Sequence, residues 1–304
     1  MNKREKEVMQ YQLAQEKQVL RQLERQYNAA LSRVNVQLAL LQSKEETASR
    51  INRINYQKAL KSQIAAILDK LHRDEYQTIH QFVNECYESG YIGMMYNLAG
   101  QGIPVIMPVD SKAAAKAVVT DSKLKHELYE ELGVDVERLK KTISKELTRG
   151  IATGLPYDDI ARNIRMLSGA PMRRAKTIVR TEAHRIQQAS QEDARQHAKS
   201  KGANVVKQWD ATLDGATRRT HRELDGQIRE LNEPFEMHGK KAMYPGDFGD
   251  PAEDCNCRCV ALTRARAALD ADELKIMEER AGKFKLDKTK DFADFRAKYM
   301  NAVK

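Results

Sequence analysis

Apolar residues recur at every seventh position through the first fifty residues of the chain. The members of this stripe are Leu13, Leu20, Tyr27, Val34, Leu41 and Ala48. Gln, Glu, Lys and Arg fill most positions between them, and residues 1–73 contain neither proline nor glycine. A heptad stripe without helix breakers predicts one long amphipathic helix or a helical hairpin. Two roles stay open, because such a seam packs equally well against its own chain or against a partner.

The composition favours long, solvent-exposed helices over a fold with one large hydrophobic core. Charged residues make up 31% of the 304 residues, aromatic residues make up 6%, and tryptophan occurs once. The formal net charge is +9, but basic and acidic residues interleave, which permits non-specific, salt-sensitive contact with DNA without sequence-specific reading. No apolar run reaches the roughly 18 residues of a membrane-spanning helix. The first residues lack the apolar block of a secretory signal, so we expect synthesis in a cytoplasm and no membrane partner.

Helical patterning continues to about residue 88 and then meets a series of glycines and prolines. These breakers predict a loop-rich stretch over 90–110, in which 103–109 could form a short extended piece. Further helices are expected at 111–133, 136–148, 157–167 and 171–199, and charged helices at 271–280 and 290–300. Strands are expected at 203–209 and 257–263, on either side of a short region dense in Asp, Gly, His and Cys.

These segments predict a mainly α-helical chain with one small α+β module. The expected domains are a long-helix or hairpin region at 1–109, a helical domain at 110–202, the module at 203–263 and a charged helical tail at 264–304.

Thiols and imidazoles gather in the module. The candidate metal ligands are His221, Cys255, Cys257 and Cys259. Zinc prefers these donor types, and one structural zinc would stabilise a domain with so few core residues. In a regular strand all three sulfurs would point to one face, so zinc binding requires a bend near Asn256 and a further ligand, His221 or His238. Buried thiols that simply pack the core are the alternative.

Two other groups of residues have both a chemical and a structural interpretation. The module's aspartates could hold a metal for phosphodiester hydrolysis, but most of them adjoin Gly or Pro, where aspartate favours turns. Arg180, Glu182 and His184 lie on one helix and could act in acid–base chemistry. We favour a structural role, in which Arg180 and Glu182 hold the module to the helix through buried ion pairs. A cysteine nucleophile with His221 as its base is also conceivable.

Several of these motifs occur in one characteristic order. They are Val-Arg-Thr-Glu-Ala-His at 179–184, Lys-Gln-Trp-Asp-Ala-Thr-Leu-Asp at 207–214, Thr-Arg-Arg-Thr-His-Arg-Glu-Leu-Asp-Gly at 217–226, Tyr-Pro-Gly-Asp at 244–247 and Asn-Cys-Arg-Cys at 256–259. Over about residues 142–263 the chain resembles the Mu-F-like minor head proteins of tailed bacteriophages, the phage head morphogenesis family. The family's motif residues correspond to Arg180, Thr181, Glu182, Trp209, Asp225 and Gly226, and its ligand positions to His221, Cys257 and Cys259. Many relatives have a Cys pair where this chain has Arg218 and His221, so this chain offers one metal ligand fewer than those relatives do.

The resemblance implies a structural role and no enzymatic one. Members of the family are internal head components that associate with the portal, help to assemble a procapsid competent for DNA packaging, and in some systems leave with the genome. The expected partners are therefore the portal protein, the major capsid or scaffolding protein and packaged DNA. The expected location is the interior of the virion head, after synthesis in the host cytoplasm. The alternative function is a metal-dependent nuclease or Cys-His hydrolase acting on nucleic acid or protein.

Overall fold

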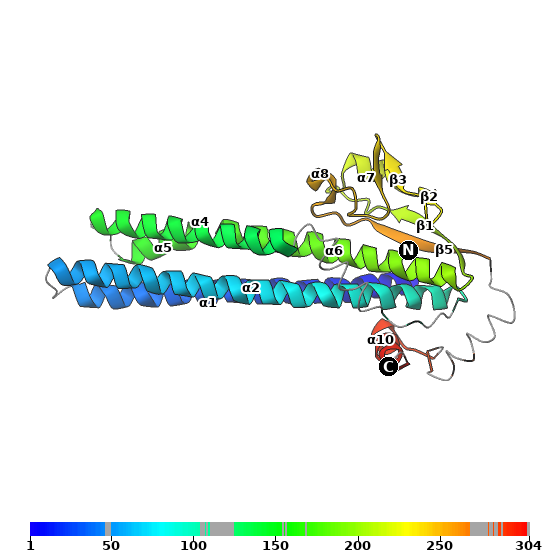
Figure 1. Ribbon diagram of the computed structural model, residues 1–304, viewed down its shortest axis with the longest axis horizontal. Helices are drawn as coiled ribbons and strands as arrows, with labels where there is room; N and C mark the ends of the chain where they lie inside the picture. The colour runs from blue at the N-terminus through cyan, green and yellow to red at the C-terminus, as the bar shows by residue number, and fades with distance from the viewer. Residues whose placement is uncertain are drawn as a thin grey trace. The chain divides into compact units, whose positions relative to one another are not determined.

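The chain is mainly α-helical, as its sequence predicts. The computed structural model (Figure 1) describes residues 1–45, 50–103, 107, 109, 125–153, 155, 157–167, 169–267, 279, 282, 285–286 and 288–302. The helices are α1 (Lys3–Glu45), α2 (Arg50–Gly100), α4 (Lys125–Ala152), α5 (Tyr157–Leu167), α6 (Gly169–Ser200), α7 (Arg219–Leu224), α8 (Pro251–Asp254) and α10 (Phe292–Ala302). The strands are β1 (Asn204–Asp210), β2 (Ile228–Arg229), β3 (Phe235–Met237), β4 (Lys240–Ala242) and β5 (Val260–Ala267). Among these described helices, none combines the length and the apolar character needed to cross a bilayer.

Contacts within the chain divide it into two compact units. The first unit comprises 1–17, 82–122 and 178–304, and the second comprises 18–81 and 123–177. Helices α1, α2 and α6 each contribute residues to both units. The domain boundaries expected from the sequence stay a prediction, because this division follows contacts between helices and not positions along the chain.

The N-terminal stripe packs largely inside the second unit. Leu20, Tyr27 and Val34 are exposed by 9%, 2% and 0%, so this part of the seam faces its own chain. Leu13, which lies in the first unit, is 53% exposed and does not share that burial. The side chains of Leu41 and Ala48 lie outside the described residues.

Helix α2 corrects the predicted loop over 90–110, because the helix continues through Gly90 and Gly93 and ends at Gly100. Both inner glycines lie where a neighbouring helix comes close. A Cβ added at Gly90 would lie 2.0 Å from Ser190 Oγ, and one added at Gly93 would lie 2.6 Å from a methyl group of Val8. The absent side chains therefore permit helix packing here and do not end the helix. Most of the predicted extended piece at 103–109 lies outside the described residues.

The remaining helices agree in part with the sequence. Helix α4 shows no break between 133 and 136, whereas residues 111–124 and most of the helix expected at 271–280 lie outside the described residues. Helix α10 confirms the tail helix predicted at 290–300. Its Phe292, Phe295 and Tyr299 are buried, and the Phe295 ring lies 5.0 Å from that of Tyr96 on α2. The end of the chain is therefore anchored to the first unit by aromatic packing.

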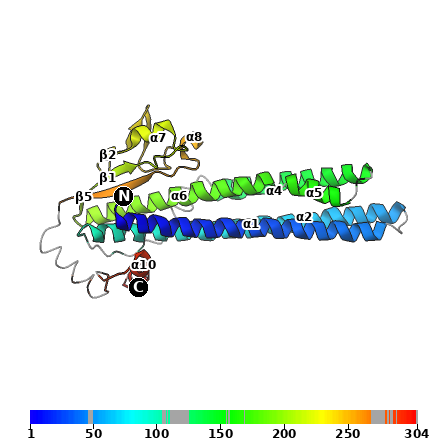
Figure 2. The same cartoon turned by 180° about the vertical axis from the view of Figure 1, so that it is seen from behind.

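The module is built on a small antiparallel sheet with the strand order β2-β1-β5. Strands β3 and β4 form a separate hairpin. In both views β5 runs beside α6 (Figures 1 and 2). Side chains hydrogen-bond to the backbone at this edge of the sheet. Gln188 accepts from the N–H of Ala261, and Arg195 donates to its carbonyl, at 2.9 and 3.0 Å. Gln101 binds the strand further along. Its side-chain amide donates to the carbonyl of Thr263 and accepts from the N–H of Ala265, both at 2.9 Å.

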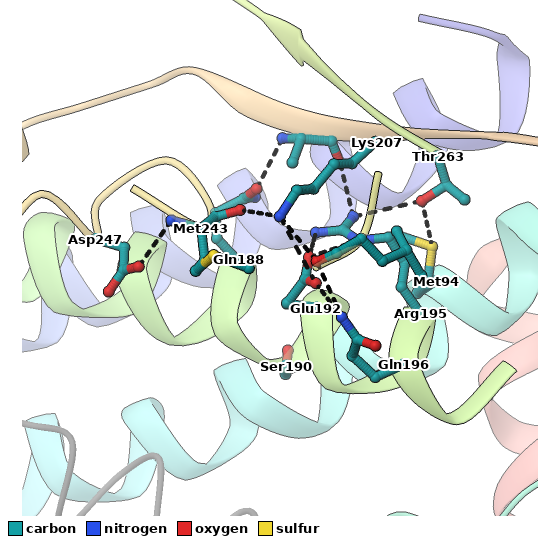
Figure 3. Close-up of polar contacts among 12 residues, drawn as sticks. Met94, Gln188, Ser190, Glu192, Arg195, Gln196, Lys207, Met243, Asp247 and Thr263 are labelled. Carbon is teal, nitrogen blue, oxygen red and sulfur yellow. Dashed lines mark hydrogen bonds and ion pairs between the residues drawn. The ribbon is translucent and has the colours of Figure 1, made fainter. Parts of the chain in front are cut away.

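A buried polar network joins α6 to the sheet, as Figure 3 shows. Lys207 of β1 and Arg195 of α6 are both fully buried. The Arg195 guanidinium pairs with Glu192 at 2.9 Å, while the Lys207 ammonium lies 3.9 Å from the same carboxylate. Lys207 also donates to the carbonyls of Met243 and Leu231, at 2.9 and 3.2 Å. Burial lowers the pKa of Lys207 to about 8. These contacts fix the orientation of the sheet on α6, because buried charges are tolerated only where partners satisfy them.

Candidate metal centre of the small module

Trp209 occupies the centre of the module core and is fully buried. Its ring lies 5.1 Å from that of Phe235, 5.8 Å from that of His221 and 5.9 Å from that of Phe248, in edge-on or tilted arrangements. Trp209 stands opposite Ala261 in the β1–β5 pairing, so it is held beside the segment that carries the cysteines. The aromatic core therefore forms one wall of the thiol cluster.

His221, Cys257 and Cys259 come together in this core. Their ligand atoms all lie within 4.8 Å of one another, and the three side chains are exposed by 5% or less. His221 Nδ1 lies 3.3 Å from the Cys259 sulfur and 3.6 Å from the Cys257 sulfur. The chain bends away from strand geometry immediately before Cys257, because Asn256 adopts a left-handed conformation with φ 54°. The bend that a shared ligand position requires is therefore present.

The far side of the His221 ring faces a carboxylate. His221 Nε2 lies 3.3 Å from Glu253 of α8, which also accepts from Lys240 Nζ and from the Thr220 hydroxyl, each at 3.0 Å. Although burial opposes its ionisation, the hydrogen bonds from Lys240 and Thr220 hold the pKa of Glu253 below its usual value. The two atoms are close without hydrogen-bond geometry, so Nε2 has no hydrogen-bond partner among the described residues. A carboxylate placed behind the ring is nevertheless the usual arrangement behind a metal-ligating histidine.

The two sulfurs share one proton unequally. The side-chain hydrogen bond with Cys257, together with that between His221 and Cys259, lowers the pKa of Cys259 to about 5. The same hydrogen bond and burial raise the pKa of the Cys257 thiol. One thiolate, one thiol and an imidazole therefore face a common point, which is a donor set suited to a soft or borderline metal ion.

Two of the other expected ligands lie elsewhere. Cys255 is half-buried and is not within the 4.8 Å group, and its carbonyl accepts a hydrogen bond from Arg218. His238 keeps 66% of its side chain exposed and pairs with Glu223 at 2.7 Å. The structure therefore brings together His221, Cys257 and Cys259, but neither Cys255 nor the alternative ligand His238.

The Arg-Thr-Glu segment of α6 contacts the module through its threonine. The Thr181 hydroxyl accepts from the backbone N–H of Asn256 at 3.1 Å. Arg180 instead pairs with Glu16 of α1 at 3.2 Å, and the buried Glu182 pairs with Arg185 on its own helix at 3.0 Å. The expected ion pairs from Arg180 and Glu182 to the module are thus replaced by the Lys207 network, whose residues carry no local sequence signal.

His184 lies near the cluster without joining it. Its Nε2 atom is buried and has no hydrogen-bond partner among the residues that the structure describes. Burial, followed by the proximity of His221, lowers the pKa of His184 to about 4. The neutral imidazole is therefore the relevant form of this side chain at ordinary pH.

The aspartates of the module act mainly on turns. Asp225 accepts from the N–H of Ala211 at 2.8 Å, and the following Gly226 adopts a φ of 78°, which suits glycine. Asp214 forms a two-pronged ion pair with Arg258, with nitrogen to oxygen distances of 2.6 and 2.7 Å. The other aspartates that bond to nearby backbone are Asp247, Asp250 and Asp254. This arrangement supports the turn interpretation over a carboxylate metal site.

Comparisons with known proteins agree with the motif order. Residues 141–262 match the family described as Phage Mu protein F like protein. The chain is 29% identical over 198 residues to the minor head protein GP7 of Bacillus phage SPP1, which covers 62% of this chain and 63% of that protein. It is 31% identical over 269 residues to the NAD(+)-arginine ADP-ribosyltransferase EFV of Enterococcus faecalis, covering 86% of this chain and 54% of that protein. The chain thus spans between about half and two thirds of the lengths of these relatives. No solved structure matches it.

Proposed function

The chain belongs, through residues 141–262, to the Mu-F-like minor head protein family, and on this premise we propose that it is a structural component of a phage head. The observation that carries the proposal is the position of the match, which contains α6 and the module as far as the first residues of β5. In this role the helical part docks on the portal and on capsid or scaffolding protein, and the module supplies a rigid second contact. The protein acts inside the head after synthesis in the host cytoplasm. Its basic faces touch packaged DNA without sequence preference.

The module's rigidity comes, in this proposal, from one structural zinc held by His221, Cys257 and Cys259. A tetrahedral zinc with ordinary bond lengths separates nitrogen and sulfur ligands by about 3.6 Å. The two His221–sulfur distances, 3.3 and 3.6 Å, are close to that value. Zinc would bind the sulfurs as thiolates and replace the shared proton, with Glu253 as the carboxylate behind His221.

Elemental analysis tests the metal part of the proposal. We expect about one zinc per chain in untagged protein purified without chelator. The zinc and several degrees of melting temperature should be lost in Cys257→Ser/Cys259→Ser. Cys255→Ser is the matched control, because Cys255 neighbours the cluster without joining it, and this variant should keep its zinc. Wild-type protein without metal would refute the structural zinc, and so would an equal loss of zinc in Cys255→Ser.

Analysis of purified heads tests the structural role. In a phage that encodes this chain, we expect the protein in DNase-treated and protease-treated heads, protected by the shell. A Lys207→Met variant, which loses the helix–sheet network, should be excluded or incorporated less. Absence of wild-type protein from the heads would refute the structural role whatever the zinc content.

Enzymatic alternatives receive less support from the geometry. The thiols of the cluster are exposed by 5% and 2%, so a nucleophile there has no access to a nucleic acid or protein substrate. The likeness to EFV is the reason to test ADP-ribosyl transfer directly. The matched region covers only 54% of that protein, so the likeness does not by itself carry its activity over to this chain. Purified chain, NAD⁺ and an arginine-containing acceptor should yield no transfer, and transfer by wild-type protein would establish an enzyme.

A further inference from the structure

A groove in the second unit has no role in the module or in its metal centre. It lies between α2 and α4 and has a volume of about 700 Å³. Its lining residues include Ile64, Ile143 and Leu147, which give it an apolar floor. These three side chains are almost fully buried, with exposures of 4%, 1% and 0%. The apolar surface that a ligand can reach is therefore formed by the half-buried Ala65 and by the aliphatic parts of the exposed lysines, which lie over them.

The rim of the groove is strongly cationic. The charged lining residues are Lys61, Lys140, Lys141, Lys145 and Arg149, and no carboxylate is among the described residues that line it. Lys140 already pairs with Asp69, and Arg149 pairs with Glu146. Three positive charges therefore remain available at the rim.

These three lysines have no carboxylate partner within the described part of the chain. Lys61 donates to the Thr148 hydroxyl at 3.0 Å, and so bridges α2 and α4 without losing its charge. Lys141 and Lys145 lie four positions apart on α4, so they share one face of the helix and stand one turn from each other. The groove therefore presents a row of cations above an apolar floor.

We propose that this groove docks an acidic amphipathic helix supplied by a partner protein. An apolar stripe on that helix would contact the floor, and carboxylates spaced one turn apart would meet Lys141 and Lys145. Charge complementarity selects an acidic occupant, and the apolar floor favours a helix over DNA, whose phosphates make no use of apolar contact. The proposal rests on the structural role above, because it supplies the chemistry of one head-assembly contact.

Peptide binding to the full-length chain tests this proposal, with fluorescence anisotropy as the readout. The probe is a synthetic helix with leucines at helical spacing on one face and glutamates beside them. A matched peptide with lysines in place of the glutamates and a short DNA duplex are the comparison ligands. We expect the acidic peptide to bind with an affinity that falls as salt rises, and the lysine peptide to bind at least tenfold more weakly.

Charge reversal locates the binding surface. Lys141→Glu/Lys145→Glu should weaken binding of the acidic peptide about tenfold or more. Lys199→Glu/Lys201→Glu makes the same change of net charge at exposed positions of the first unit and should leave binding within about twofold. Equal loss in both variants would show attraction to net charge only. Tighter binding of the duplex than of the peptide, lost in the groove variant alone, would instead identify a DNA site, and either result would overturn the proposal.

The two proposals can fail separately. Circular dichroism and zinc content should be unchanged in Lys141→Glu/Lys145→Glu, since both side chains are exposed and neither belongs to the unit that contains the cluster. The docking surface is refuted if the wild-type protein binds no acidic peptide and Lys141→Glu/Lys145→Glu keeps its zinc and enters heads normally. That result would leave the proposed role in the head intact.

Discussion

Replacement of Gly90 by alanine puts a methyl group where α2 and α6 approach each other. The added Cβ would lie 2.0 Å from Ser190 Oγ, 2.7 Å from the Gln187 carbonyl oxygen and 3.1 Å from the Gln187 Cα. The hydroxyl could rotate away, but the two Gln187 atoms belong to the backbone, so the helices themselves must separate. Overpacking of this kind costs up to about 3 kcal/mol, and the better helix propensity of alanine returns about 1 kcal/mol. We therefore expect the free energy of unfolding to fall by about 2 kcal/mol.

Urea denaturation followed by tryptophan fluorescence measures this change in the correct unit. Trp209 is the single tryptophan of the chain and lies in the first unit, as Gly90 does. Gly215→Ala is the control, because its Cβ would meet nothing within 4 Å and its backbone does not require glycine. We expect the control to lie within about 0.5 kcal/mol of wild type.

A second variant separates the two sources of strain. Gly90→Ala/Ser190→Ala removes the hydroxyl contact and keeps the two backbone contacts with Gln187, so only part of the lost stability should return. A Gly90→Ala protein as stable as the Gly215→Ala control would refute the conclusion that glycine is required there for helix packing.

Three further predictions concern buried polar groups. Burial raises the pKa of Glu75 to about 8, so the folded state keeps a proton that the unfolded chain releases near pH 4.3, and stability falls as pH rises between these values. Glu75→Gln should remove this fall and raise the free energy of unfolding at pH 8 by up to ~4 kcal/mol; parallel pH curves for the two proteins would contradict the assignment. Arg195→Met should cost about 3–5 kcal/mol in denaturant unfolding, because it leaves the Glu192 carboxylate buried beside Lys207 alone, and Glu192→Gln added to it should restore part of that loss. Gln101→Ala should speed hydrogen exchange at the Ala265 amide by tenfold or more, and unchanged exchange would show that the side chain does not protect the strand.

The predictable parts of the fold are those with a local cause. The heptad stripe predicts the long N-terminal helices, and the alternation over 203–209 predicts β1, because side-chain period follows directly from backbone geometry. The glycines at 90 and 93 mislead, since whether glycine breaks a helix or admits a neighbour depends on what packs there. Ser190 and Val8, the residues that decide it, are distant in the sequence.

The candidate site divides in the same way. Residue type and spacing single out His221, Cys257 and Cys259. The bend expected near Asn256 is present, and it is formed by the left-handed conformation of that residue. Glu253 carries no such signal, because a glutamate in a four-residue helix looks like any surface carboxylate until the fold places it behind His221. The partner of Arg180 is equally unpredictable, since Glu16 lies on another helix 164 positions away.

The side chains that cover the outer edge of β5 all precede that strand in the sequence. Gln101, Gln188 and Arg195 leave the ribosome before residues 260–267 do. An uncovered edge strand is a template for pairing with another chain. The side chains that cover the edge are therefore synthesised before β5 is. A nascent chain that has folded its helices can complete the module without an intermediate that exposes an unpaired, aggregation-prone strand. A circular permutant that begins at Gly202 would reverse this order and should aggregate during expression although its final contacts are the same.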